Sequence, residues 1–576
     1  MGSIQLANPM LRVNEEKAPC HVPSLLSLDR TLAAECEGVT LGARQLTAHQ
    51  ILAVARGSAK VEFTDSECIL ERIAECHSRM MDNVRDGVPV YGCNTGYGAQ
   101  AAKRMAEGSG FLRDWSARSI SEAISAIDVS VGPAFDRDIV RGGMLIRINM
   151  LMAGVSGVKI ADLDLIRELL NHNLTPLVNQ FGGLGASGDL AHNARVVSVL
   201  RQLRGAKVID ASGRVLDAPE AMAACKIPPL QLDPKAGLGL CNGDNFSTSI
   251  ALLLTIDTLR VLLALVAVSA MTIEVLGGTD RVFHPMLSAL RPHPGQSDIA
   301  YMLRCLLSGS SLAQQEMTGP KSRPQGVSVQ DGYSLRGLAQ YLGVSAERVL
   351  DSINIVERNA NSVSDNPLWV PPEYANEGET PWQWVSGANF LAMHVAEVMD
   401  GIRKTLSHIV KLCDRHLARM VNPNLNNGLS PNLSEPLAIT GCTFKGVQIQ
   451  SGMFDVYSQI LSQPVTTMFG VHEEGNQDVT SHALTSGILG LENLRLARYS
   501  VAQNLMAVAQ AVDLRGGPHL LSPRTRPIYD FIRSRVEYAN HERPMHFDIE
   551  CLYATLVNDE FGHLLRSESF SGLGHS

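Results

Sequence analysis

The stretch FGGLGASGDLAHNARVV, residues 181–197, places four glycines, one alanine and one serine within the seven residues 182–188. An ordered glycine loses more backbone freedom than any other residue, so such a cluster needs a physical reason. The backbone could turn tightly, approach another group closely, or itself react. Because good helix-forming residues follow directly, the loop lies at the start of a predicted helix.

A nucleotide-binding loop is the first alternative, since Gly183, Gly185 and Gly188 match the pattern G-x-G-x-x-G. That fingerprint needs a buried parallel strand directly before the first glycine, whereas the residues that precede it here, NHNLTPLVNQF, are mostly polar. A P-loop needs Gly-Lys-Ser/Thr, and a nucleophile elbow needs glycine where Asp189 stands. A turn that caps a helix at Asp189 would need one or two glycines rather than four. We therefore expect no nucleotide cofactor.

The remaining explanation is that the backbone reacts. In Ala186-Ser187-Gly188 the glycine nitrogen has no bulky neighbour, so in a tightly bent loop it can attack the alanine carbonyl carbon. Loss of two waters, one from the serine side chain, then gives a five-membered ring with an exocyclic methylene. This group is methylidene-imidazolone (MIO), a strong electrophile, and we expect the chain to form it autocatalytically.

Composition narrows the class of protein. The chain has 576 residues, of which 45% are apolar and 19% charged, which is typical of a large globular protein. The net charge of −9 is spread along the chain, so neither nucleic acid nor a membrane surface is an expected partner. Eleven cysteines occur without metal-ligand spacing, and the N-terminus lacks a signal peptide pattern. We expect a cytoplasmic protein that binds no metal.

Long helical patterns account for most of the chain. Apolar residues recur at three- and four-residue spacing over residues 389–421 and 487–514, which predicts helices of about 30 residues, well above the usual length. The apolar segment 251–278 is interrupted by three charged residues, and its uninterrupted part is shorter than the roughly 20 residues of a membrane span. This segment is therefore expected to be a buried helix of a large bundle.

Strand-like segments are few and short. They include KVEF from Lys60, and KVIDASGRVL from Lys207, which predicts a hairpin followed by a helix that begins after Asp217. The predicted fold class is mostly α, a large multi-helix bundle with long central helices plus a small mixed N-terminal region that carries the cofactor loop. The predicted divisions are a disordered tail at 1–25, an MIO-bearing domain at 26–245, a central helical bundle at 246–515 and a C-terminal helical segment at 516–576.

Motifs from about residue 45 to 515 resemble, in the same order, those of the MIO-dependent aromatic amino-acid ammonia-lyases and aminomutases. GLGASGDLA is similar to that family's signature, and YGCNTGYG from Tyr91 is similar to its Tyr-Gly-x-x-Thr-Gly-Phe-Gly loop. KAGLGLCNG from Lys235 resembles its Lys-Glu-Gly-Leu-Ala-Leu-x-Asn-Gly. The other similar segments are QDGYSLR, NSVSDNPL, GANF, FKGVQIQ and EEGNQD.

This resemblance implies an enzyme that eliminates ammonia from an aromatic L-amino acid and leaves a cinnamate-like α,β-unsaturated acid. A 2,3-aminomutase, which returns the amine at the β-carbon, and a non-catalytic relative remain alternatives. The resemblance also implies a homotetramer in which long central helices pack together and each active site draws residues from three chains.

The resemblance further implies roles for individual residues. Tyr91 would be the general base on the β-proton, which requires a phenol pKa lowered from about 10. Arg336 would hold the substrate carboxylate through a bidentate guanidinium, with Asn389 as an additional donor. The other expected site residues are Asn242 on the cofactor ring, Phe390 beside the substrate ring, and Tyr333, Gln330, Glu473 and Gln477 around the amine.

The chain departs from the family pattern at several positions. By spacing, Ala126-Ile127 corresponds to the pair that contacts the substrate ring, which tends to be Ser-His, His-Leu or Phe-Leu in histidine, tyrosine and phenylalanine enzymes. Histidine is therefore not the expected substrate, and Ala126 predicts a wide pocket for a larger or substituted ring such as an indole. Alternatively, Ala126 packs against the bundle if the register differs by one turn.

Other departures lie close to the cofactor motifs. His192 stands where proline is common, and Cys241 and Asp244 replace isoleucine and threonine beside Asn242. A carboxylate at Asp244 could alter the electronics of the cofactor or the fate of the amine.

Overall fold

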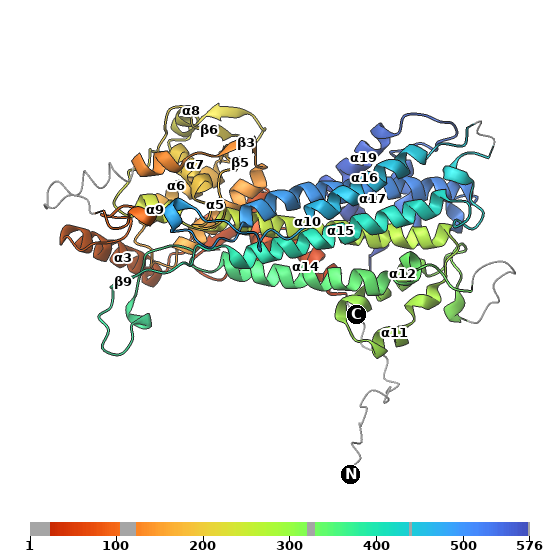
Figure 1. Ribbon diagram of the computed structural model, residues 1–576, viewed down its shortest axis with the longest axis horizontal. Helices are drawn as coiled ribbons and strands as arrows, with labels where there is room; N and C mark the ends of the chain where they lie inside the picture. Colours follow the sequence, from red (N-terminus) through yellow and green to blue (C-terminus); the bar gives the residue numbers. More distant parts are fainter. Residues whose placement is uncertain (1–22, 104–121, 319–328, 437–439, 574–576) are drawn as a thin grey trace, which may run out of the picture.

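The computed structural model describes residues 23–103, 122–318, 329–436 and 440–573. Four long helices run along the long axis of the molecule (Figure 1): α10 (Asn245–Val275), α14 (Leu338–Ala360), α15 (Met393–Val421) and α17 (Ala483–Leu514). Short strands occur mainly in the N-terminal half of the chain. The predicted mostly α fold with long central helices is confirmed.

Shorter helices surround the four long ones and cover their ends. In the N-terminal half they are α1 (Ser24–Ala33), α2 (Ala48–Ala55), α3 (Glu67–Arg85), α5 (Arg137–Leu151), α6 (Ile160–Asn171), α7 (Leu190–Leu200), α8 (Ala218–Ala224) and α9 (Ala236–Cys241). In the C-terminal half they are α11 (Pro285–Leu290), α12 (Pro294–Leu307), α13 (Tyr333–Arg336), α16 (Lys445–Leu461), α18 (Arg526–Arg533), α19 (His546–Val557) and α20 (Glu560–Leu564).

The strands form small separate sheets. Parallel β1 (Gly38–Leu41) and β2 (Lys60–Phe63) make one, and antiparallel β3 (Val131–Ala134) and β5 (Asn179–Phe181) make another. Strands β4 (Thr175–Pro176), β6 (Lys207–Ile209) and β7 (Val215–Asp217) form a three-stranded sheet, and β8 (Leu368–Trp369) pairs with β9 (Trp384–Val385). The predicted hairpin is the β6–β7 pair, and α8 begins directly after Asp217, as expected.

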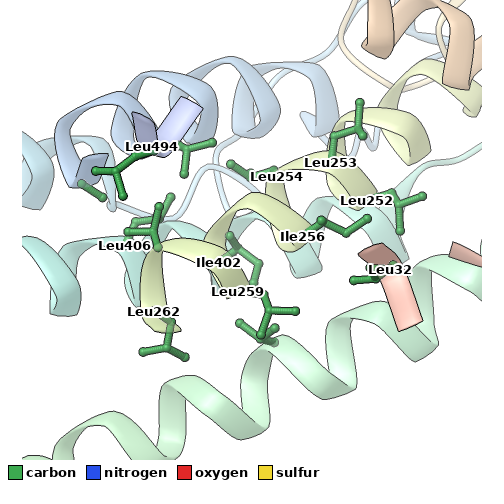
Figure 2. Close-up of a cluster of buried hydrophobic side chains, with 14 of the residues drawn as sticks. Leu32, Leu252, Leu253, Leu254, Ile256, Leu259, Leu262, Ile402, Leu406 and Leu494 are labelled. Carbon is green, nitrogen blue, oxygen red and sulfur yellow. The ribbon is translucent and has the colours of Figure 1, made fainter. Parts of the chain in front are cut away.

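Helix α10 forms the centre of the hydrophobic core. Its leucines pack against Ile402 and Leu406 of α15 and Leu494 of α17 (Figure 2). By length and composition the segment Ala236–Val275 could cross a membrane, but 89% of its apolar window is buried inside the protein. It is therefore the buried bundle helix that the sequence predicts.

The three charged residues that interrupt this apolar segment all have partners. Asp257 forms ion pairs with Arg498 at 2.8 Å and Arg56 at 3.1 Å. Arg260 lies 3.5 Å from Asp559, while Glu274 accepts a hydrogen bond at 2.7 Å from the backbone of a residue that precedes α18. A buried charge is tolerated when it is paired, so Asp257 and Arg260 fix the neighbours of α10 through ion pairs, while Glu274 does so through its hydrogen bond.

Two predicted boundaries differ from the structure. Helix α15 begins at Met393 rather than at residue 389, and the backbone N–H of the preceding Ala392 donates to the carbonyl of Gly185 in the loop at 182–188, at 3.4 Å. The tail predicted at 1–25 is too long: α1 begins at Ser24 and Leu25 is fully buried, while residues 1–22 lie outside the described part of the chain. The predicted boundaries at 245 and 515 lie at the start of α10 and just after the last residue of α17. One hydrophobic core extends across both, and the division into domains stays a prediction.

Candidate active site

The loop at 182–188 joins β5 to α7 and is sharply bent. Gly185 and Gly188 have left-handed backbone angles, with φ of +77° and +68°. Gly188 also packs against the backbone of Gly243, where an added Cβ would lie 2.4 Å from the carbonyl carbon. No residue with a side chain fits at this position, so the loop has the bend and the close approach that its glycines allow.

Contacts from distant segments hold this bend. The hydroxyl of Ser481 donates to the carbonyl of Gly185 at 2.9 Å, and the backbone N–H of Asp189 donates to the carbonyl of Gly243 at 2.8 Å. The Asp189 carboxylate accepts from the N–H and hydroxyl of Ser247 at 2.8 and 2.7 Å, so it caps α10 rather than its own helix α7. Burial raises the pKa of Asp189 to about 7.

A cavity of about 140 Å³ lies beside Ser187. It brings together residues from segments that are far apart in the sequence. Seven of the predicted site residues line it: Tyr91, Ile127, Ser187, Asn242, Phe390, Glu473 and Gln477. Much of the remaining wall is apolar and includes Ala123, Ile124, Leu190 and Leu238. The cavity therefore combines a polar group of residues with an apolar compartment.

Tyr91 is held by a backbone contact. The N–H of Gly98 donates to its hydroxyl oxygen at 2.9 Å. Burial raises the pKa of Tyr91, the Gly98 N–H acts in the opposite direction, and the negative charge of Glu473 raises it further. The net direction within one chain is thus opposite to the lowering that a general base requires.

Glu473 and Gln477 approach this site from the segment between α16 and α17. The side-chain amide of Gln477 donates to the hydroxyl of Ser187 at 3.0 Å. The Glu473 carboxylate lies directly against Gly98, where an added Cβ would be 1.5 Å from its Oε1. Gly98, with φ of +53°, is therefore required both for its backbone angle and for this contact.

Asn242 ends α9 and is fixed by a buried charged network. Its side-chain amide donates to the carbonyl of Asn366 at 3.2 Å, and its own carbonyl accepts from Arg147 at 3.2 Å. Behind it, Lys235 and Asp365 form a fully buried ion pair at 2.7 Å. Because buried charges are costly unless they are paired, this network holds Asn242 in one orientation toward the cavity.

Gln330, Tyr333 and Arg336 form a second cluster elsewhere. The guanidinium of Arg336 lies over the ring of Tyr333 at 4.4 Å from its centre. With its amide in the orientation that satisfies its neighbours, Gln330 accepts from Arg336 at 2.9 and 3.2 Å. The cluster lines a surface hollow of about 590 Å³, and Tyr333 is 79% exposed. These three residues are arranged together at the surface.

Helix α14 separates the cluster from the cavity. Arg336 ends α13, directly before the start of α14, whereas Asn359 in the last turn of α14 donates to Asp244 at 3.0 Å, next to Asn242. A helix of 23 residues is about 34 Å long at 1.5 Å per residue. Within one chain, the predicted site residues therefore lie in two groups that cannot contact each other.

Two predicted residues are placed differently from expectation. Ala126 lines an adjoining hollow that shares Ile127, Ser187, Leu190 and Gln477 with the cavity, whereas Ala123, one helical turn earlier, lines the cavity itself. Successive helix residues point about 100° apart, so an assignment by spacing alone moves easily to a neighbouring face. Asn389 is exposed and donates to the carbonyl of Val363 at 3.3 Å, while the adjacent Phe390 lines the cavity.

His192 and Asp244 lie behind the cavity rather than in its wall. His192 packs between Phe135 and Phe246, and burial lowers its pKa to about 4, so it is a neutral core residue. Asp244 accepts from Asn359, which joins the start of α10 to the end of α14. An influence of Asp244 on the fate of the amine stays a hypothesis.

Sequence analysis missed one polar residue of the cavity wall, Tyr97. The available signal was the motif YGCNTGYG itself, in which Tyr97 stands where the related motif has phenylalanine. Over the described ranges, no three His, Cys, Asp or Glu side chains come together in a group that could bind a metal ion.

Comparisons with known proteins agree with this geometry. The family model described as "Aromatic amino acid lyase" matches residues 46–534. Phenylalanine ammonia-lyase of Nostoc punctiforme is 32% identical over 487 residues, which cover 83% of this chain and 82% of that enzyme. Phenylalanine ammonia-lyase 1 of Pleurotus ostreatus is 32% identical over 503 residues, and the match spans 84% of this chain but only 66% of that enzyme. The structure of tyrosine aminomutase from Streptomyces globisporus has a TM-score of 0.82 at 27% identity and covers 93% of this chain and 100% of its own.

These matches, together with the mostly α bundle, define the class of protein as a carbon–nitrogen lyase. The chain belongs to the aromatic amino acid lyase family, among whose similar members are both ammonia-lyases and aminomutases.

Proposed function

We propose that this protein eliminates ammonia from an aromatic L-amino acid to give a cinnamate-like acid, with an MIO group formed from Ala186, Ser187 and Gly188. The observation that carries this proposal is the single cavity in which Tyr91, Asn242 and Ser187 face an apolar compartment. An amino acid has a polar reacting end and, in this class, an apolar ring, and the cavity matches both parts.

The loop fits the proposed cofactor. Cyclisation needs the nitrogen of Gly188 close to the carbonyl of Ala186, and the left-handed bends at Gly185 and Gly188 favour such a conformation. The close packing of Gly188 on Gly243 leaves no space for a side chain, which agrees with an unhindered nitrogen. When formed, the group would supply an electrophile for the substrate amine.

The side chains of the cavity would then have separate roles in the reaction. Tyr91 would accept the β-proton, and Asn242, fixed by its buried network, would hold the cofactor ring. Gln477, which reaches Ser187, and Glu473 would surround the amine. Because burial raises the pKa of Tyr91, a positive charge close to its hydroxyl is needed to favour the phenolate. Arg336 of another chain is our candidate for such a charge, in addition to its role on the carboxylate.

The size of the cavity favours a single six-membered ring. Its volume is about 140 Å³, and an apolar cavity of about 150 Å³ binds benzene in another protein. The expectation of a wider pocket at Ala126 stays a prediction, because Ala126 lines an adjoining hollow of about 290 Å³.

We also propose a homotetramer with shared active sites, located in the cytoplasm. The split between the cavity and the Arg336 cluster supports sharing, since Arg336 cannot reach the cavity of its own chain. Helix α16 adds a second argument, because its surface carries an apolar stripe of exposed residues at helical spacing: Ile449, Met453, Val456 and Ile460. Light scattering should give the mass of four chains, and an active monomer would contradict this assembly.

An aromatic amino-acid 2,3-aminomutase is the alternative. Proteins with that name are among both the similar sequences and the similar structures. The non-catalytic alternative is weaker, since Tyr91, Ser187, Asn242 and Arg336 are all present.

Incubation with a panel of aromatic amino acids tests the proposal. Ammonia and an α,β-unsaturated acid indicate a lyase, while a β-amino acid without net ammonia indicates an aminomutase. The intact mass of the protein should be two waters below the encoded mass. A protein of full encoded mass that turns over none of the panel would contradict the proposed function.

A further inference from the structure

A surface hollow of about 630 Å³ lies between the N-terminal end of α5, the C-terminal end of α2 and the β6–β7 hairpin. Three arginines from two of these elements line it: Arg56, Arg137 and Arg141. The hollow shares no lining residue with the cavity at Ser187 or with the surface hollow at Arg336. Its charged side chains therefore have no part in the reaction proposed above.

Arg141 is a buried cation without a carboxylate partner. Only 2% of its surface is exposed, and its Nε and Nη1 donate to the carbonyls of Val54 and Leu170 at 3.0 and 3.1 Å. Its Nη2 has no hydrogen-bond partner among the described residues and is not fully covered by protein atoms. This nitrogen lies beside Gly57, which also lines the hollow and whose added Cβ would be 4.0 Å away. A buried charge is costly unless it is paired, so Arg141 indicates an anion that enters from the hollow.

Arg137 has the same arrangement one turn earlier on α5. Its Nη1 donates to the carbonyl of Ala211 at 3.3 Å, while its Nη2 has neither a partner in the described part of the chain nor a full covering of protein atoms. Burial and the positive charge of Arg137 lower the pKa of Arg141 to about 10. Like charges four residues apart destabilise a helix, and positive charges are unfavourable at its N-terminal end. An anion between Arg137 and Arg141 would offset both costs.

Two aspartates also line the hollow, but they do not neutralise these arginines. Asp136 is exposed to solvent, and Asp138 accepts a hydrogen bond at 2.9 Å from the backbone N–H of Ile139. Within the described ranges neither aspartate forms an ion pair with Arg137 or Arg141. The two guanidinium groups therefore remain without a counter-charge in the protein itself.

We propose that this hollow is a binding site for a small oxyanion, a phosphate or carboxylate group, held by the guanidinium groups of Arg137 and Arg141. Each guanidinium has an unpartnered Nη2 and can donate to an oxygen of the same anion. Phosphate and carboxylate groups match the geometry of a guanidinium better than other anions do. This inference goes beyond the proposed ammonia-lyase function and does not depend on it, so either can fail alone.

Isothermal titration calorimetry with inorganic phosphate and with succinate, at constant ionic strength, tests the site. Both probes should bind the full-length protein, and Arg137→Gln should weaken their binding by about 10- to 100-fold, as expected for the loss of a charge-assisted hydrogen bond. Tighter binding of phosphate would assign the ligand as a phosphate group, and tighter binding of succinate as a carboxylate. No binding of either probe, or binding that Arg137→Gln leaves unchanged, would overturn the proposal.

Matched variants separate this hollow from other positive groups of the protein. Arg204→Gln removes the same charge at an exposed position outside the hollow and should leave the affinity for phosphate unchanged. Arg336→Ala should also leave it unchanged. A loss of binding in the Arg336 variant would place the anion at the proposed site of the substrate carboxylate and would overturn the inference.

The pH dependence of anion binding gives a second readout. Burial raises the pKa of Asp138 to about 6, with further increases from the negative charges of Asp257 and Asp136 and an opposite effect from Arg56. Sulfate keeps its charge in this range, so its affinity should increase as the pH falls through 6 and Asp138 becomes neutral. Asp138→Asn should abolish this increase. A sulfate affinity of the parent protein that does not rise would place the anion away from Asp138, and thus outside this hollow, and would overturn the proposal.

Discussion

Tyr91 and Arg336 lie in contrasting surroundings. Tyr91 is part of a cavity whose walls come from six distant stretches of the chain and whose loop is held by contacts from α10 and the residues just before α17. Arg336 lies at an open surface hollow, where it is positioned by Gln330 and by the ring of a largely exposed tyrosine. One region is thus a cavity formed within the chain, and the other lies at an open surface of the same chain.

The rigid helices explain this difference. Helix α10 runs from the cavity to the vicinity of the Arg336 cluster, and its 31 residues span about 46 Å. Helix α14 joins the same two regions in the opposite direction. No loop movement can close such a distance, so the two half-sites can meet only when chains associate. The predictions below test this separation.

The largest effect is expected for Ser187→Ala. The variant should fold with the parent's helix content and keep its full encoded mass. It should lose activity by about 10³-fold or more, as when a group essential to covalent catalysis is removed. Intact-mass spectrometry and an ammonia assay check both points, and retention of substantial activity would show that the loop at 182–188 is not the electrophile.

Mixing two inactive variants tests the separation directly. If sites are shared, co-expression of Ser187→Ala with Arg336→Ala should restore activity, because some sites combine an intact Ser187 with an intact Arg336 from different chains. For random assembly about a quarter of the sites should be intact. Co-expression of Ser187→Ala with Tyr91→Phe is the control and should restore nothing, since both residues belong to the same cavity. Equal outcomes in the two mixtures would refute shared sites.

Tyr91→Phe should lower kcat by about 10²- to 10⁴-fold while the mass loss of two waters is retained. In the parent, kcat/KM should rise with pH, because burial raises the pKa of Tyr91 and only the deprotonated phenol can accept a proton. The variant should lose this rise. Near-normal turnover with an unaltered pH profile would place the general base elsewhere.

Arg336→Lys should act mainly on substrate binding. A lysine provides one point charge in place of a bidentate guanidinium, so KM should increase by about 10-fold or more while the cofactor forms normally. Steady-state kinetics measure the effect, and Arg348→Lys, on α14 but outside both half-sites, is a matched control. An unchanged KM would make Arg336 a structural residue.

The smallest expected effect is a change in the pH dependence of Tm caused by Glu274, which lies near the C-terminal end of α10. Burial raises the pKa of Glu274 from 4.5 to about 7, so its contribution to stability is fully present below pH 4.5 and is lost as the pH rises through 7. Glu274→Gln cannot ionise, so its Tm should fall less than that of the parent between pH 5 and 8, by a few degrees. Activity should be unchanged, because Glu274 belongs to neither half-site. Identical pH profiles of Tm would contradict the pKa assignment.

The local parts of the site could be predicted from the sequence. Glycines with a positive φ, such as Gly185 and Gly188, leave a clear pattern, and so does the three- and four-residue spacing of long helices. Ala123 was not identified, because a spacing argument cannot fix which face of a short helix meets the cavity. The capping of α10 by Asp189 was also hidden, since it joins elements that are 58 residues apart.

The division of the site into two groups was suggested only by the family resemblance, which implies shared active sites, and not by the residues themselves. The order of the motifs indicates which residues take part in the proposed reaction. The distance between Arg336 and the cavity, however, is set by the path of α14 through the bundle. Tyr97 is a different case, because the tyrosine was visible in the motif while its place in the cavity wall became apparent only from the structure.

The hydrogen bond from Ser481 to Gly185 has a consequence for the timing of biosynthesis. These residues are 296 positions apart, so a ribosome must make more than half of the chain between them before the contact can form. Until then the glycine-rich loop lacks one of the contacts that hold its bend. If the loop cyclises as proposed, a nascent chain that stops short of Ser481 should therefore remain uncyclised, and the backbone reaction would be a late event that follows assembly of the bundle.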